Sequence, residues 1–147
     1  MAAIKLDDSL FANVDLDLRS RLDLQPLVDA FGDDIIDLWV GRVKRTYEAH
    51  LEVVWEPRHN PTSIILRFCK LVKDLPPSKR KLWDAAKSRS FDIGIEAPAK
   101  GKYYWSALSS EAIRAAAEVG AQIAITVYGP MKVAKRSRKT SESSSTK

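Results

Sequence analysis

Cysteine and histidine are scarce in this chain, which limits its metal and nucleophile chemistry. Cys69, His50 and His59 are the only residues of these two types. Structural zinc takes four Cys or His ligands, so no zinc site is expected. A nucleophilic cysteine needs an exposed, electropositive setting. Arg67 and Lys70 lie near Cys69, but they are typical of the solvent face of an amphipathic helix whose other side buries the thiol.

The acidic residues offer two candidate arrangements for acid–base chemistry. His50 lies between Glu48 and Glu52 in a predicted strand, where a surface cross-strand pair is the simpler interpretation and a general base the alternative. Asp92 and Glu96 share the polar side of another strand, about 13 Å apart along it. Paired glycosidase carboxyls lie roughly 5 to 9.5 Å apart, so these two do not form such a pair. An enzyme would need a pocket that brings together distant residues such as His50, Glu52 and Asp92.

Phosphate-binding loops are missing from the sequence. Such loops need closely spaced glycines, and the six glycines here are scattered singly. The sequence therefore predicts no bound cofactor and no metal, and it favours a non-enzymatic protein over an enzyme.

One short segment interleaves cations with aromatic residues. It runs Lys100-Gly-Lys-Tyr-Tyr-Trp105. Tyr and Trp are enriched at interface hot spots, so Tyr103, Tyr104 and Trp105 are the candidate partner-binding residues. The same composition suits stacking on single-stranded nucleic acid. The simplest alternative is a short strand whose alternate rings face the core.

Positive charge is concentrated at the C-terminal end. From Lys132 onward there are six basic residues and one acid, which leaves eighteen residues of each sign in the rest of the chain. A neutral body shows no sign of the basic face of a groove-binding domain. The basic cluster can add salt-sensitive affinity for nucleic acid or anionic membrane, or it can be a solubilising terminus. The residues expected to make such contacts are Lys132, Lys135, Arg136, Arg138 and Lys139.

Hydrophobic periodicity predicts the elements that must position these residues. Strands are expected at 10–18, 35–43, 49–55, 91–97, 103–107 and 123–127. Helices are expected at 23–32, 60–72, 78–88 and 109–120. The first six elements and the strand at 91–97 follow the order of the split βαβ unit in ferredoxin-like domains, with a β-α-β unit added after it. We therefore expect a single α+β domain at 1–130, with a mainly antiparallel sheet packed against helices, and a disordered basic tail rich in Ser and Thr at 131–147.

Several short motifs carry a resemblance to a known family. They are Leu75-Pro-Pro, Leu82-Trp-Asp, Arg89-Ser-Phe-Asp-Ile-Gly-Ile-Glu96, Leu108-Ser and Gly120-Ala-Gln-Ile-Ala-Ile-Thr-Val-Tyr128. This C-terminal half resembles an uncharacterised family of small bacterial α+β proteins, a domain of unknown function. The resemblance implies a bacterial cytoplasmic protein, and it supplies no catalytic residues.

These observations predict a non-enzymatic cytoplasmic module that binds another protein, as an accessory or immunity-like factor. A cytoplasmic location is expected because the N-terminus does not resemble a signal peptide and no apolar run reaches about 18 residues. The first alternative is a nucleic-acid-associated protein that uses the basic tail. The second is a small enzyme whose site is not visible in the sequence. Exposed sheet edges could support a homodimer, although no sequence feature requires one.

Overall fold

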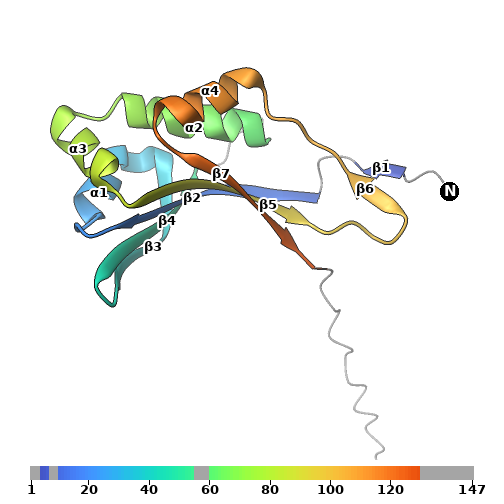
Figure 1. The fold of residues 1–147 in the computed structure, drawn as a ribbon, viewed down its shortest axis with the longest axis horizontal. Coiled ribbons are helices and arrows are strands. Elements are labelled where there is room, and N and C mark those ends of the chain that lie inside the picture. The colour runs from blue at the N-terminus through green and yellow to red at the C-terminus, as the bar shows by residue number, and fades with distance from the viewer. Residues whose placement is uncertain (1–3, 7–9, 55–59, 130–147) are drawn as a thin grey trace, which may run out of the picture.

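The structure, a computed structural model, describes residues 4–6, 10–54 and 60–129 (Figure 1). The strands in these ranges are β1 (Ile4–Leu6), β2 (Phe11–Ser20), β3 (Ile35–Val43), β4 (Thr46–Val53), β5 (Ser88–Glu96), β6 (Lys102–Tyr104) and β7 (Gln122–Tyr128). The helices are α1 (Gln25–Phe31), α2 (Pro61–Lys73), α3 (Pro77–Ala85) and α4 (Ser110–Glu118), with a short 3₁₀ helix, η2 (Gly32–Asp34), after α1.

Five of the strands form one sheet in the order β3-β4-β2-β5-β7. The first four strands pair antiparallel with their neighbours, in the split βαβ arrangement that the sequence predicts. β7 follows α4 and adds to β5 in parallel. The fold is therefore α+β, a single domain with a ferredoxin-like core and one added edge strand.

The strand predicted at 103–107 does not join this sheet. β6 covers only Lys102–Tyr104, and it pairs in parallel with β1 in a separate two-stranded sheet. No strand was predicted at Ile4–Leu6, because three residues are too few for a period-two pattern to be visible. The prediction therefore missed β1, the pairing partner of β6. Of the predicted β-α-β addition, only β7 joins the main sheet, and α4 leads the chain to it.

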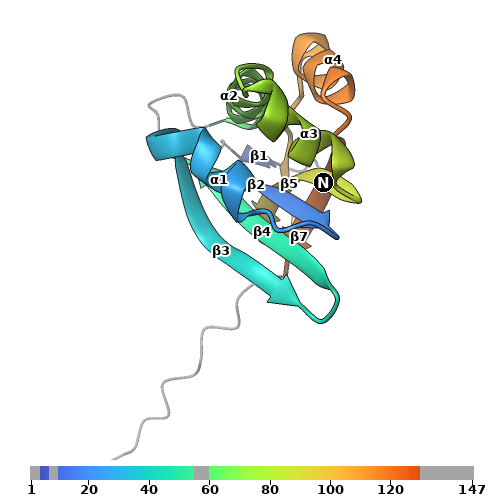
Figure 2. The same cartoon turned by 90° about the vertical axis from the view of Figure 1, so that its left-hand side faces the viewer.

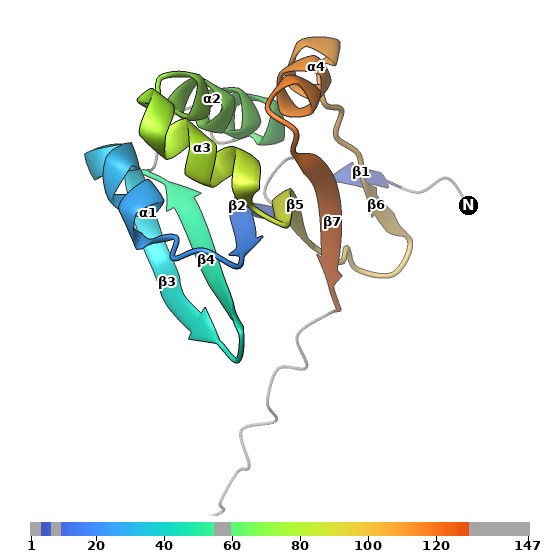
Figure 3. The same ribbon diagram turned by 60° about the vertical axis from the view of Figure 1, so that its left-hand side comes forward.

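All helices lie on one face of the five-stranded sheet (Figures 2 and 3). The other, which we call the open face, carries no helix among the described residues. None of the described helices is long and apolar enough to cross a lipid bilayer.

The central strand, β2, shows the expected alternation with one correction. Val14, Leu16 and Leu18 are buried beneath the helices. Near the start of the strand its register against β5 shifts, so that Phe11 is buried as well. Ala12, which the predicted alternation placed inside, is exposed because the irregularity turns its side chain outward.

The predicted hairpin is confirmed, with a shorter turn. β3 has the predicted bounds, and β4 begins at Thr46 rather than at Ala49. Lys44 takes a positive φ of 55°, and the Thr46 hydroxyl donates to the carbonyl of Val43 at 3.1 Å. This tight turn lets pairing begin at Thr46. Trp55, the last residue of the predicted partner strand, lies outside the described residues.

The helix predicted from Asn60 is confirmed with its cap. The Asn60 side chain accepts a hydrogen bond from the amide of Ser63 at 2.9 Å, which satisfies one free donor of the first turn. Phe68 on the buried side of α2 stacks on Phe91 of β5, with ring centroids 5.5 Å apart. This ring contact holds α2 against β5.

The third helix packs through a residue that the pattern did not single out. Leu82, Ala85 and Ala86 were expected to pack, but Ala85 is exposed and Trp83 is fully buried. The Trp83 indole donates to the carbonyl of Val119 at 2.8 Å, so its polar atom is satisfied within the core. α3 ends at Ala85, before the predicted Ser88.

Arg89 closes the C-terminal ends of two helices. Its Nη1 donates to three carbonyls at the end of α3, those of Trp83, Asp84 and Ala86, at 2.9, 3.2 and 3.0 Å. Its Nε donates to the carbonyl of Gly120, just beyond α4, at 3.0 Å. One guanidinium therefore donates to carbonyls at helix ends, where intrahelical donors run out, and it ties α3 to α4.

Replacing Arg89 by methionine should destabilise the domain by about 2 kcal/mol or more, because several carbonyls lose a charged donor. The matched control is Arg80→Met, which removes the same charge from α3. Arg80 makes an exposed ion pair with Asp84 at 3.2 Å, so its loss should change the free energy of unfolding by less than about 0.5 kcal/mol. Urea unfolding measures both variants, and equal losses would contradict the role given to Arg89.

Candidate functional site

Two depressions lie on opposite faces of the sheet. The first, which we call the apolar hollow, has a volume of about 410 Å³ and lies on the helix-covered face. It is lined by Pro61, Ile93, Ile95, Tyr104, Trp105, Ser106, Leu108, Ile113 and Ile125. No charged side chain is among these residues, so a ligand of this hollow must itself be apolar where it enters.

The apolar hollow forms where the helices stop covering the added strand. Ile123 packs against the core, whereas Ile125 and Val127, on the same side of β7, are 65% and 60% exposed. Ile113 at the exposed side of α4 is half exposed as well. Large apolar side chains grouped in this way mark interaction surfaces more often than single exposed ones do.

The three candidate partner-binding residues separate in the structure. Tyr104 and Trp105 both line the apolar hollow, while Tyr103 is not part of it. Trp105 is 58% exposed, Tyr103 is 41% exposed, and Tyr104 packs partly against the core. A binding role for the three remains a prediction. Ile113 and Ile125 were missed, because their neighbours in the hollow come from distant parts of the chain.

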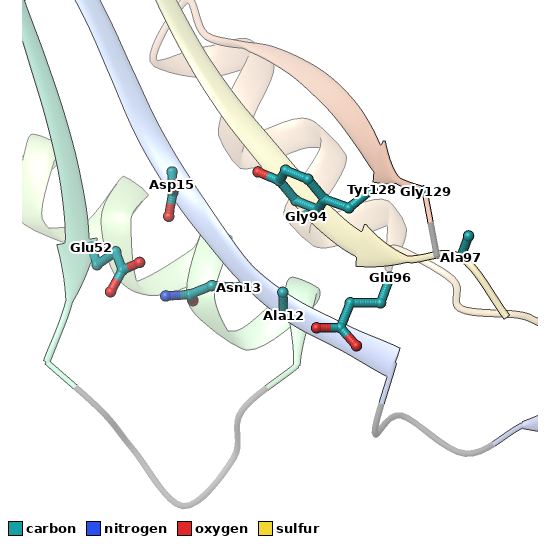
Figure 4. Close-up of a pocket in the computed structure, with 9 residues that line it drawn as sticks. All are labelled: Ala12, Asn13, Asp15, Glu52, Gly94, Glu96, Ala97, Tyr128 and Gly129. Carbon is teal, nitrogen blue, oxygen red and sulfur yellow. The ribbon is translucent and has the colours of Figure 1, made fainter. Parts of the chain in front are cut away.

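The second depression, which we call the acidic groove, lies on the open face and has a volume of about 710 Å³ (Figure 4). It is lined by Ala12, Asn13, Asp15, Glu52, Gly94, Glu96, Ala97, Tyr128 and Gly129. The Tyr128 ring lies over Gly94, where an added Cβ would approach it to 3.3 Å. Glycine at this position therefore leaves room for the ring.

Asp15 is the most perturbed group on the open face. Burial raises its pKa from 3.8 to about 7, helped by the charge of Glu52, by a hydrogen bond to that carboxyl, and by Asp17 and Asp92. Asp15 Oδ1 is inaccessible to solvent and meets no donor among the described residues. Two ionised carboxylates cannot hydrogen-bond to each other, so Asp15 is protonated when it bonds to the Glu52 carboxyl. With a pKa of about 7, Asp15 can hold or release a proton near neutral pH.

His50, Glu52 and Asp92, the residues that an enzyme would have to bring together, all lie on the open face, but each has a different partner. His50 Nδ1 lies 2.7 Å from Asp17 Oδ1 on the neighbouring strand. The hydroxyl of Thr126 donates to Asp92 at 2.8 Å. The Glu52 carboxyl pairs with Asp15 instead. His50 Nε2 also lies 3.6 Å from the carboxylate of Glu48 on the same strand, whereas the predicted cross-strand pair is the one with Asp17.

The other sequence candidates have simpler positions. Cys69 is buried in α2, and burial raises the pKa of its thiol to about 11, so its role is that of a core side chain. Within the described ranges no three Cys, His or acidic side chains gather as a metal ion would need. His59 and all five basic residues singled out in the tail lie outside the described residues.

The acid pair predicts a pH dependence of stability. Because the pKa of Asp15 is raised to about 7, the folded protein keeps the Asp15 proton between about pH 4 and 7, whereas the unfolded chain has already lost it in this range. Stability from this group is therefore greatest at low pH and falls as the pH rises through 7. Asp15→Asn keeps a donor for Glu52 and removes the charge, so its melting temperature at pH 8 should exceed that of the unaltered protein by a few degrees.

The control for this measurement is Asp37→Asn, which removes one charge from the exposed strand β3. It should leave the pH dependence unchanged. Melting curves between pH 4 and 8 give the comparison. Parallel profiles for Asp15→Asn and the unaltered protein would mean that folding does not raise the pKa of Asp15.

Comparisons with known proteins do not assign this chain to a family. No protein-family model, no curated protein and no solved structure matches it. The lining residues and charges of the two depressions are therefore the features that bear on function.

Proposed function

We propose that this chain is a non-enzymatic protein-binding module whose apolar hollow receives apolar side chains from a partner protein. The observation that carries the proposal is the hollow itself, which places Trp105 and Ile113 half exposed at the border of an uncharged depression. Contact with water costs about 25 cal/mol for each Å² of such surface, and a partner that covers it removes that cost.

The composition of the apolar hollow favours a protein partner. Interface hot spots are enriched in Trp and Tyr and cluster in pockets that lose their water on binding. Trp105 supplies a large apolar ring and Tyr104 supplies a second, each with a polar atom at one end. Ser106 adds one hydroxyl to the lining. A short apolar segment of a partner, held by a few hydrogen bonds, fits this chemistry.

A bacterial cytoplasmic setting and an accessory, immunity-like role form part of the same proposal. They rest on the motif resemblance in the C-terminal half and on the absence of a catalytic motif from the sequence. His50, Glu52 and Asp92 each have a different partner, so they do not form the single catalytic cluster that an enzyme would need from them.

The proposal predicts that Trp105→Ala and Ile113→Lys abolish capture of one partner protein from a native lysate of the source cells. Both residues are half exposed, so neither change should prevent folding. Loss of a hot spot costs about 2 kcal/mol or more, and the captured partner should bind each variant roughly 30-fold more weakly by calorimetry.

Trp39→Ala is the matched control. Trp39 is a similarly exposed tryptophan on β3, where its ring lies 6.2 Å from that of His50 on the open face. Its loss should leave capture unchanged. A partner that binds Trp105→Ala and Ile113→Lys as tightly as the unaltered protein would contradict a role for the apolar hollow.

One alternative function is favoured by the division of charge. The body carries equal numbers of basic and acidic residues, so affinity for nucleic acid would reside in the basic tail from Lys132 onward. A chain that ends at Met131 should then lose all binding to a single-stranded oligonucleotide. For the full chain, five phosphate contacts predict that log K falls against log[salt] with a slope of about −3.5. Equal binding by the two chains would exclude the tail.

A further inference from the structure

The two edges of the five-stranded sheet differ in their protection. β3, at one end, has an irregular register between Asp37 and Trp39 and carries the charged side chains of Asp37 and Arg42. Bulges and charges of this kind prevent an edge from pairing with another strand. β7, at the other end, pairs with β5 in unbroken register and has no charged residue among its seven (Figures 1 and 3). Within the described residues, β7 therefore has neither the bulge nor the charges that protect an edge strand from pairing.

The backbone of β7 directs a set of hydrogen-bonding groups away from the sheet. The carbonyl of Tyr128 accepts from the amide of Ala97 at 2.8 Å, so Tyr128 faces the β5 side. Since alternate residues of a strand face opposite sides, the amides and carbonyls of Ile123, Ile125 and Val127 point to the outer edge. No strand within the described part of the chain pairs there.

We propose that a second copy of this chain pairs with the outer edge of β7, antiparallel and about a two-fold axis at Ile125. In this register Ile125 faces its own copy, and Ile123 faces Val127 on both sides of the axis. These are the residues whose backbone groups point outward, so each opposed pair exchanges two hydrogen bonds. Two five-stranded sheets then become one continuous sheet.

The side chains of β7 match their own copies in this arrangement. The apolar side chains of Ile123, Ile125 and Val127 meet on the helix-covered face, where the last two are largely exposed in the single chain. On the open face Thr126 opposes Ala124. No charge opposes a like charge, because β7 carries none. A self-complementary patch is what a two-fold interface requires, whereas a strand of an unrelated protein would match this pattern only by coincidence.

The inference goes beyond the proposed function and does not depend on it. The two surfaces are nevertheless contiguous, since Ile125 lines the apolar hollow and also occupies the axis. The second copy would therefore add an apolar wall to each hollow.

Sedimentation of the full chain over a wide range of concentration tests the proposal. The unaltered protein should sediment as a dimer, and Ile125→Lys should sediment as a monomer, because two lysines would face each other at the axis. The matched control is Ile36→Lys on the opposite edge strand, where an exposed isoleucine gives way to the same charge. It should remain a dimer.

Three outcomes would overturn the proposal. They are a monomer at every concentration, a dimer that survives Ile125→Lys, and a dimer that Ile36→Lys dissociates. Amide exchange gives an independent measure, since the amides of Ile123, Ile125 and Val127 should exchange more slowly as the concentration rises. Trp105→Ala distinguishes partner binding in the apolar hollow from dimerisation through β7, because it should abolish capture of the partner protein while the dimer remains.

Discussion

The pairing of β2 between β4 and β5 is the constraint on which the rest of the structure depends. Leu16 and Leu18 face the helices, so every second residue of the same strand, including Asp15 and Asp17, must face away from them. The neighbouring strands follow the same alternation in register. A one-residue slip would bury the carboxylates and expose the core. The alternation thus creates the apolar face beneath the helices and crowds acidic side chains on the open face.

The added unit of α4 and β7 explains why the apolar surface is unevenly covered. A ferredoxin-like core ends at β5, and α4 returns the chain so that β7 can pair beside it. α4 covers the beginning of β7, where Ile123 is partly buried, but Ile125 and Val127 extend past it. The same extension produces the apolar hollow on the helix-covered face and leaves the outer edge of β7 without a paired strand in the described part of the chain. Both proposed interaction surfaces therefore arise from one addition to the core.

The sequence predicts the fold more fully than the site, for physical reasons. Alternation and end caps are local, so β3 and the helix beginning at Asn60 were correctly placed. Period two in β2 indicates a polar side, but the raised pKa of Asp15 depends on which strands become its neighbours. The apolar hollow likewise combines residues from five elements and one loop. Of its members, Tyr104 and Trp105 were visible in the sequence only because aromatic residues are frequent at interfaces.

The most direct test of the central claim, that the apolar hollow binds a partner, is an isoleucine-methyl NMR spectrum recorded with and without the captured protein. The isoleucines are well distributed for this purpose, because Ile113 borders the hollow, Ile93 lies in its floor and Ile36 is on the far edge strand. Binding in the apolar hollow should shift the methyl signals of Ile113 and Ile93 and leave that of Ile36 unchanged. A shift of Ile36 alone, with Ile113 and Ile93 unmoved, would contradict it.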